Sequence, residues 1–148
     1  MDVVLDSGGR PSTIIGISEN NGLGEVYVYC PATTGMGWKA QDIRTSGVTD
    51  SCSVLAVAFS PEFADDATIA AVVTNASETR VRFACGFVDG VVEWDVTIGY
   101  VRIRDGETGA AFPATCASIG FPDDFELDTD SAICFVGLAD NQTTPDPA

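Results

Sequence analysis

The chain has no histidine among its 148 residues. A Ser-His-Asp triad, a Cys-His pair and a histidine-ligated zinc site are therefore excluded within this sequence. It also lacks a Cys-x-x-Cys pair, a glycine-rich dinucleotide-binding motif and a phosphate-binding P-loop. An acid–base pair of carboxylates stays open because 22 Asp and Glu residues are present, although no spacing singles out two of them.

Positive charge is scarce, since seven Lys and Arg against 22 Asp and Glu give a formal net charge of −15. Nucleic-acid binding needs a basic surface that neutralises phosphates, and an anionic membrane repels an acidic chain, so this composition argues against both partners. We interpret the acidity as a solvated shell that keeps an apolar protein dispersed. The alternatives are binding of divalent cations and life in a salty or extracellular medium.

Long hydrophobic runs are missing, and none approaches the roughly 18 residues of a membrane-spanning helix. The N-terminal segment 1–11 is acidic, and its apolar part is too short for a secretory signal peptide. Either a signal has been removed, or this is a segment of a longer chain, or the protein is cytosolic. The repeats described below are incomplete at both ends, which favours the segment. Residues 141–148, with Pro, Thr and Asp, are expected to form a linker or frayed end.

Helical periodicity is absent as well, and the apolar residues gather instead in short runs rich in Val, Ile, Phe and Tyr. Two stretches, Thr13–Cys30 and Thr68–Cys85, align without a gap, and a third copy starts at Ala132. A tryptophan follows each of the first two copies, at Trp38 and Trp94. Such self-similarity indicates one supersecondary unit copied along the chain.

A second repeated block relates Val54–Ile69 to Ala117–Ile133, each with two phenylalanines around a proline. Together the blocks predict one all-β domain over residues 1–140, built from units of four short antiparallel strands at about 1–50, 51–114 and 115–140. We expect the chain to begin near the second strand of the first unit. The runs LAVAFSP and ATIAAVV are expected to form inner strands covered on both faces. The strand residues expected in the core are Ile15, Val28, Leu55, Val57, Phe59, Ile69, Ala71, Val73, Phe83, Ile119, Ile133 and Phe135.

Five cysteines occupy related positions, Cys30 with Cys85 and Cys52 with Cys116, while Cys134 falls within a predicted strand. Sequence order suggests Cys30–Cys52 and Cys85–Cys116 disulfides. Their predicted places at opposite ends of a strand about 17–20 Å long conflict with the limit of about 7 Å between bridged Cα atoms. We therefore favour buried, reduced thiols and keep the disulfides as the alternative.

The acidic turn over residues 122–130 provides the candidate metal ligands Asp124, Asp128 and Asp130. Alternating carboxylates on a loop can surround a calcium ion with oxygen ligands, although the glycine and terminal glutamate of an EF-hand are missing. The competing interpretation is that an aspartate accepts backbone N–H groups and caps the turn. No other cofactor is expected.

The segments before the two tryptophans carry a family resemblance. Segment 31–38, PATTGMGW, keeps Gly35 and Trp38, and segment 87–94, FVDGVVEW, keeps Asp89 and Trp94. These positions resemble the hairpin motif of Asp-box, or BNR, propellers, and segment 54–72 resembles the first two strands of a blade in sortilin-like propellers of bacterial cell-surface and surface-layer proteins. The resemblance implies a partial β-propeller of about two to two and a half blades, with both tryptophans in equivalent, packed positions. A two-sheet β-sandwich is the alternative fold.

We expect a non-catalytic structural or adhesive module at the cell surface, outside the cell. It should self-associate or dock onto neighbouring domains through Thr13–Ser18 and Ala132–Leu138, because incomplete repeats leave apolar faces and strand edges open. The resemblance also implies an alternative, a glycan-binding or sialidase-like glycan-hydrolysing propeller. A sialidase places an arginine cluster on the substrate carboxylate, and alternating arginines occur here in two pairs, Arg80 with Arg82 and Arg102 with Arg104. Such pairs share one sheet face and more often lie in solvent.

Overall fold

The computed structural model describes residues 1–5, 9–18, 23–30, 37–43, 52–88, 91–96, 99–125 and 133–139. Within these ranges the chain forms eleven strands and one short helix, so the predicted all-β class is confirmed. The strands make three antiparallel sheets, which we call sheets one, two and three in chain order.

Sheet one is a four-stranded meander in the order β1-β2-β3-β4. Its strands are β1 (Asp2–Leu5), β2 (Pro11–Ser18), β3 (Gly24–Tyr29) and β4 (Lys39–Ala40). Their Ile, Val and Tyr residues suit a pleated, half-buried surface. The expectation that the chain begins near the second strand of its unit is wrong, because β1 pairs along its whole length with β2.

Sheet two repeats this meander as β5-β6-β7-β8, with β9 paired to the first half of β7. Its strands are β5 (Ser53–Phe59), β6 (Ile69–Thr74), β7 (Thr79–Val88), β8 (Val91–Trp94) and β9 (Tyr100–Arg102). All residues from Ile69 to Val73 are buried, so β6 is the predicted inner strand with both faces covered. The less buried β5 is an edge strand of this sheet.

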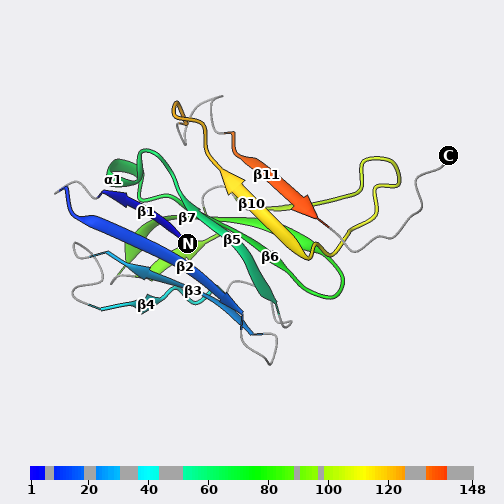
Figure 1. Cartoon of the computed structure of the whole chain (residues 1–148), viewed down its shortest axis with the longest axis horizontal. Helices are drawn as coiled ribbons and strands as arrows, with labels where there is room; N and C mark the ends of the chain where they lie inside the picture. Colours follow the sequence, from blue (N-terminus) through cyan, green and yellow to red (C-terminus); the bar gives the residue numbers. More distant parts are fainter. Residues whose placement is uncertain are drawn as a thin grey trace.

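The two sheets on either side cover sheet two, which lies in the middle of three stacked layers (Figure 1). Sheet three consists of β10 (Cys116–Gly120) and β11 (Phe135–Ala139). One apolar core lies between sheets one and two and includes Ile14, Val28, Ile69 and Trp94. A second core joins Val72 and Phe83 of sheet two to the inward residues of sheet three, Ala117, Ile119, Val136 and Leu138.

Glycine allows the close approach of sheets one and two. A Cβ atom on Gly16 would overlap the side chain of Val54, and one on Gly24 would lie 2.7 Å from the carbonyl oxygen of Cys52. The backbone N–H of Gly24 donates to that same oxygen, and Leu23 forms a parallel bridge with Cys52. Small residues of one sheet therefore receive the bulky side chains of the next.

The orientation of the sheets distinguishes the two predicted architectures. Ile14 and its repeat counterpart Ile69 both lie in the core between sheets one and two, so these sheets meet through equivalent faces. Blades of a ring, in contrast, repeat by rotation and place the front of one blade on the back of the next. The arrangement of sheets one and two is compatible with the two-sheet sandwich, and the described residues do not form a closed ring.

The proline-aromatic turn that follows β5 recurs after β10. The short helix α1 (Phe63–Asp66) follows β5, and the rings of Phe59 and Phe63 lie 4.4 Å apart. The rings of Phe121 and Phe125 lie 4.6 Å apart in the second copy. In both copies the later phenylalanine donates its backbone N–H to a carbonyl oxygen three residues earlier. The repeated block inferred from the sequence therefore has a repeated local structure.

Most of the predicted core residues are inside the protein. Seven are buried, namely Val28, Val57, Phe59, Ile69, Ala71, Val73 and Phe83. Three are half-buried, namely Ile15, Leu55 and Ile119. The prediction is wrong for Ile133 and Phe135, whose side chains are 52% and 66% exposed.

A one-residue offset explains the error at Phe135. The linear alignment equates Phe135 with the buried Ala71. In the structure Val57 pairs with Ala71. Ile119, the repeat counterpart of Val57, pairs with Val136 and not with Phe135. Because successive strand residues point to opposite faces, the offset turns Phe135 outward.

Candidate functional site

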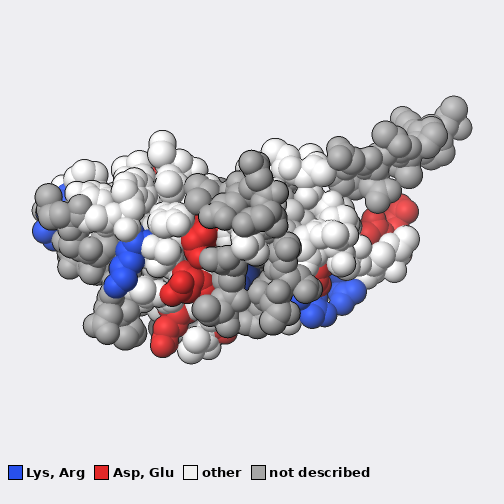
Figure 2. Space-filling view, turned by 90° about the horizontal axis from the view of Figure 1, so that it is seen from below, with Lys and Arg blue, Asp and Glu red and all other residues white. Residues whose placement is uncertain are grey.

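On the face shown in Figure 2, the described charged side chains lie in small separate groups. The visible Lys and Arg side chains do not merge into a stripe on the described part of that face. The chain as a whole carries a formal charge of −15. The described part of this face therefore shows no basic stripe of the kind that binds an anionic polymer.

The two tryptophans have different environments, so the prediction of equivalent packed positions is wrong. Trp38 precedes β4, is 51% exposed and lies with its ring centre 5.8 Å from that of Tyr29. Trp94 ends β8, is 4% exposed and donates its Nε1–H to the carbonyl oxygen of Gln41 at 2.7 Å. The other two positions of the motif, Gly35 and Asp89, lie outside the described residues.

Strand register explains why the two tryptophans lie in different environments. Trp94 pairs with Ala84, which lies in the core between sheets one and two. Trp38 lies one residue before Lys39, which pairs with the inward-facing Val28. Trp38 therefore points to the outer side of sheet one, and Trp94 points to the inner side of sheet two.

Arg82 is a buried cation in the core rather than a solvated side chain. It is 1% exposed, donates from Nε to Asp95 Oδ2 at 2.9 Å, and donates from Nη1 to the carbonyl oxygen of Ile43. Its guanidinium also lies 5.6 Å from the centre of the Trp94 ring. Burial without these partners would be very unfavourable, so Arg82 tethers sheet two to the end of sheet one.

A second arginine cluster is partly exposed on the same face of β7 and β9. Arg80 pairs with Glu78, and Arg102 Nε lies 3.3 Å from the other carboxylate oxygen of Glu78. Tyr100 lies beneath both guanidinium groups, 4.8 Å from Arg80 and 5.7 Å from Arg102. The structure thus brings three predicted arginines to one face together with a tyrosine and a glutamate that the sequence did not single out. Arg104 instead donates to the carbonyl oxygen of Gly109 on an exposed turn.

Of the three candidate calcium ligands, one lies among the residues that the structure describes. Asp124 is exposed in the turn after β10, while Asp128 and Asp130 lie outside the described residues. Among the residues that are described, no group of three or more Cys, Asp or Glu side chains could hold a metal ion. In the equivalent turn after β5, Asp66 accepts the Ser60 hydroxyl and the Thr68 N–H, each at 2.7 Å. That contact matches the capping interpretation of such turns.

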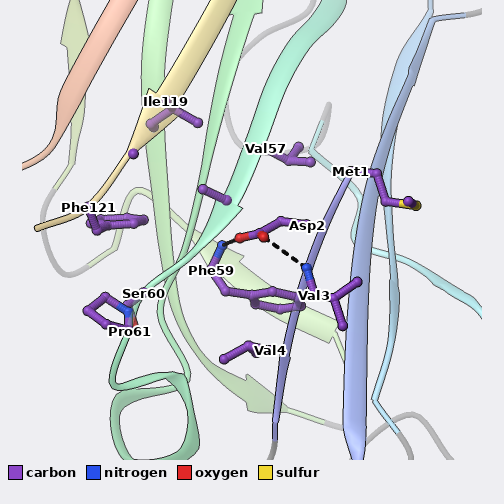
Figure 3. A pocket seen from close by; sticks show the side chains of 12 residues that line it. Met1, Asp2, Val3, Val4, Val57, Phe59, Ser60, Pro61, Ile119 and Phe121 are labelled. Carbon is purple, nitrogen blue, oxygen red and sulfur yellow. Dashed lines mark hydrogen bonds between the residues drawn. The ribbon is translucent and has the colours of Figure 1, made fainter. Parts of the chain in front are cut away.

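A cleft of about 410 Å³ opens at the free edge of β5, between β1 and β10 (Figure 3). The side chains of Val3 and Val4 from β1 line one side and those of Ile119 and Phe121 from β10 line the other, while polar atoms make up most of the exposed surface of the cleft. The carboxylate of Asp2 lies at the centre, where Oδ2 accepts the Phe59 N–H at 2.9 Å and Oδ1 accepts the Val3 N–H at 2.8 Å. Each oxygen of this carboxylate thus accepts one backbone N–H group, which ties β1 to the edge of β5.

Asp2 protects the exposed edge of sheet two, since a charged side chain facing an edge strand discourages pairing with another chain. We expect Asp2→Ala to lower the free energy of unfolding by about 1–2 kcal/mol, because the Phe59 N–H loses a charged acceptor. Urea denaturation measures this change. Asp124→Ala, which removes an exposed carboxylate from a turn, serves as the control, and an equal loss in both variants would contradict the role of Asp2.

The five cysteines form no disulfide, as the favoured interpretation of the sequence predicts. Cys30 and Cys52 are buried, Cys85 and Cys134 are half-buried, and Cys116 is exposed on β10. Burial also raises the pKa of the Cys134 thiol above its ordinary value. The expectation of buried thiols is therefore wrong for Cys116, which alternates outward on its strand.

These differences predict an order of chemical labelling. A maleimide reagent at neutral pH should modify Cys116 first, because only an exposed thiol can supply accessible thiolate. Cys134 should react more slowly and accelerate only as the pH rises towards its raised pKa, where the thiolate forms. Mass spectrometry of timed digests gives the order, and Cys116→Ser should abolish the fastest phase. Fast labelling of Cys30 would contradict the described core.

The outer face of sheet one is the first of two uncharged surfaces. Val3 and Leu5 of the edge strand β1 are 54% and 60% exposed there, and the half-exposed Trp38 lies against Tyr29 towards the opposite edge. The same face includes the half-buried residues Thr13, Ile15, Tyr27, Tyr29 and Ala40. Glu25 shares this side of β3 but is buried, and its Oε1 accepts the N–H groups of Val26 and Ile43. The described part of this face therefore presents bulky apolar and aromatic groups without an exposed charge.

The outer face of sheet three is the second uncharged surface, and its side chains are small. Its exposed residues are Cys116, Ser118, Gly120, Phe135, Gly137 and Ala139. They form three cross-strand pairs, Cys116 with Ala139, Ser118 with Gly137, and Gly120 with Phe135. Phe135, at one end, is the bulky member of the set. Sequence reasoning missed both outer faces, although the alternation along β1, β10 and β11 is the signal that could have revealed them.

Comparisons with models of known protein families, with curated proteins and with solved structures found no match. In the described part of the chain, no helix has the length and hydrophobicity required to cross a membrane.

Proposed function

We propose that this protein is a non-catalytic structural or adhesive module of a cell-surface assembly, and that it self-associates or docks onto neighbouring domains through the outer faces of its end sheets. The observation that carries the proposal is that the described strand residues exposed on both outer faces are uncharged, bulky and apolar on sheet one and mostly small on sheet three, in a chain of net charge −15. Soluble monomers rarely expose contiguous apolar patches, and such patches mark interaction sites.

The energetics of burial support the same proposal. Val3, Leu5 and Trp38 on one face, and Phe135 on the other, are each at least half-exposed. Covering them removes apolar area from water, which stabilises a contact by roughly 25 cal/mol per Å² before association costs. The acidic remainder of the surface keeps copies apart elsewhere, so association is directed to the two outer faces.

The resemblance of segment 54–72 to sortilin-like repeats of bacterial surface proteins supports the proposed location, outside the cell. The strands that we expected to flank the contact, Thr13–Ser18 and Ala132–Leu138, overlap β2 and β11 of the end sheets. A calcium ion on Asp124, Asp128 and Asp130 stays a proposal of the same kind.

Fluorescence quenching of Trp38 tests the proposal. In a Trp94→Phe variant, Trp38 is the single tryptophan, and it is half-exposed on the proposed contact. We expect acrylamide to quench it efficiently in dilute solution and less efficiently as the protein concentration rises. In a matched Trp38→Phe variant the buried Trp94 should be poorly quenched at every concentration. Quenching of Trp38 that does not depend on concentration would contradict self-association through sheet one.

The alternative is a glycan-binding or glycan-hydrolysing module, and one observation favours it. Arg80, Arg102 and Tyr100 converge with Glu78 on a partly exposed face, which combines cations for an acidic sugar with a hydroxyl and a carboxylate. Both guanidinium groups already pair with Glu78, which is why we rank this function second. Turnover of an aryl sialoside that is lost in Tyr100→Phe and Arg102→Ala would establish the hydrolysing form of the alternative, and no turnover would remove that form. Binding to a glycan array that is lost in Arg102→Ala would establish the binding form, and no binding would remove it.

A further inference from the structure

Sheet three repeats the first half of the meander seen in sheet two. Its strands β10 and β11 are the repeat counterparts of β5 and β6, and they pair in the same antiparallel way. In sheets one and two the second strand also pairs with a third, β2 with β3 and β6 with β7. Among the described strands, β11 pairs with β10 alone (Figure 1). The place beside β11 that corresponds to β3 and β7 is therefore filled by no described strand.

The side chains of β11 are less covered than those of a strand with two neighbours. Val136 and Leu138 pack towards sheet two but are only half-buried. In β6, which has a strand on either side, every residue from Ile69 to Val73 is buried. A third strand in sheet three would cover Val136 and Leu138 further, because neighbours across strands contact one another on each face of a sheet.

The backbone of β11 has hydrogen-bonding groups to match. The carbonyl oxygen of Ala139 accepts the N–H of Thr115 at 2.8 Å and therefore points towards β10. Backbone groups of successive residues in an antiparallel strand point to opposite edges, so Val136 and Leu138 direct theirs away from β10. No described residue hydrogen-bonds to these groups. This edge thus presents N–H and C=O groups in the arrangement that another strand complements.

The sequence that follows β11 is poorly suited to this place. The third strands of sheets one and two begin after short connections, at residues 19–23 and 75–78. A connection of that length after Ala139 leads to residues 144–147, which include Pro145 and Pro147. Proline has no N–H to donate to a ladder, so a paired strand that starts there is disfavoured. The place beside β11 therefore suits a strand of another polypeptide.

Sheet two shows which side chains such a strand needs. In β7, Val81 and Phe83 face the core between sheets two and three, and they alternate with Arg80 and Arg82. A strand beside β11 likewise needs apolar residues on the side of Val136 and Leu138, at alternate positions. Its remaining side chains lie beside the exposed, uncharged residues of β11. Basic residues suit these positions, because a chain of net charge −15 attracts a cationic partner.

We infer that the free edge of β11 binds, by β-strand addition, an extended segment of another protein in which apolar residues alternate with Lys or Arg. This inference rests on the proposed docking function and names the chemistry of the partner. In this mode of recognition the main-chain hydrogen bonds provide affinity, and the alternate side chains provide specificity.

A synthetic peptide with the sequence of residues 79–84, TRVRFA, is the probe, and NMR of the ¹⁵N-labelled protein reports its binding. The amides of Val136 and Leu138 should exchange rapidly with solvent in the free protein. Saturation with the peptide should slow this exchange by about tenfold or more, because the peptide supplies hydrogen-bond acceptors. The amide of Gly137, which points towards β10, should be protected in both states. Rapid exchange at Val136 and Leu138 in the saturated protein would contradict the inference.

Two N-methylated forms of the peptide are the matched controls. Methyl groups on alternate amides remove the donors along one edge of the bound strand and leave the other edge intact. Methylation of the edge that faces β11 should weaken binding by about fivefold to tenfold for each lost hydrogen bond, and methylation of the other edge should not weaken it. Equal losses in the two forms, or equal binding of a scrambled peptide with the same composition, would show charge attraction without strand addition.

Two variants test the same contact from the side of the protein. Leu138→Pro removes an N–H from the free edge and should abolish peptide binding. Leu138→Ala removes the same apolar contacts but keeps the N–H, so it should retain part of the binding. Circular dichroism establishes whether each variant folds. If Leu138→Pro does not fold, the methylated peptides on the unmodified protein still decide the question.

The outcomes separate this inference from the broader proposal. If the protein self-associates in light scattering but the peptide does not protect the edge of β11, strand addition is wrong and the proposed self-association survives. If the peptide protects this edge while the protein stays monomeric, self-association fails and docking of a partner strand stands.

Discussion

Replacing Trp94 with alanine should lower the free energy of unfolding by about 3–5 kcal/mol, the range for removing a large aromatic side chain from a core. Trp94 is 4% exposed, lies in the core between sheets one and two, and loses its hydrogen bond to the carbonyl oxygen of Gln41 in the variant. The carbonyl of Gln41 and the guanidinium of Arg82 lose a partner at the same time. Chemical denaturation followed by circular dichroism measures the change.

Trp38→Ala is the matched control for this experiment. Trp38 is half-exposed and its principal described contact is with the ring of Tyr29, so its loss should cost about 1 kcal/mol. Equal losses for the two tryptophans would restore the equivalence that the repeated sequence suggests and would contradict the register described for β4 and β8.

Replacing Arg82 with methionine should destabilise the protein by about 3–5 kcal/mol, because it leaves a charge without its partner in a largely buried site. The Asp95 side chain is 12% exposed, and its Oδ1 atom is buried and has no hydrogen-bond partner. The carbonyl oxygen of Ile43 also loses its donor. Thermal or urea unfolding of the variant measures the loss.

A double-mutant cycle distinguishes the ion pair from packing. Adding Asp95→Asn to Arg82→Met should recover part of the stability, since the orphaned carboxylate is removed. Arg102→Met, at a half-exposed ion pair with Glu78, should cost less than about 1 kcal/mol. A small effect at Arg82, or no recovery in the double variant, would show that the cation does not hold the two sheets together.

The sequence was sufficient to predict the strands and the repeats but not the faces that they cover. The repeated Thr-Ile starts locate β2 and β6, and the paired phenylalanines locate the turns after β5 and β10. Whether a given residue points inward depends on a one-residue choice of register. An alignment along the chain cannot fix that choice, because it contains no information on which strand residues are opposite one another.

In the candidate sites, too, the sequence predicts local features but not the contacts between distant residues. The alternation of Arg80 with Arg82 predicts a shared face, and the structure confirms it, whereas the pairing of Arg102 with Arg80 across strands was not predicted. It could not predict that Arg82 is buried, because the partners Ile43 and Asp95 lie 39 and 13 residues away in the chain. Asp2 likewise reaches Phe59 across 57 residues. Such long-range contacts follow from the stacking of the sheets, which no local pattern records.

The mass of the unmodified protein in solution, measured by light scattering from micromolar to millimolar concentration, tests the central claim most directly. We predict that the mass rises above the 15.4 kDa of one chain as concentration increases, and that high salt promotes the rise by screening repulsion between the acidic copies. A mass that remains that of one chain over the whole range, at low and high salt alike, would contradict the claim that the outer faces of sheets one and three are surfaces for self-association.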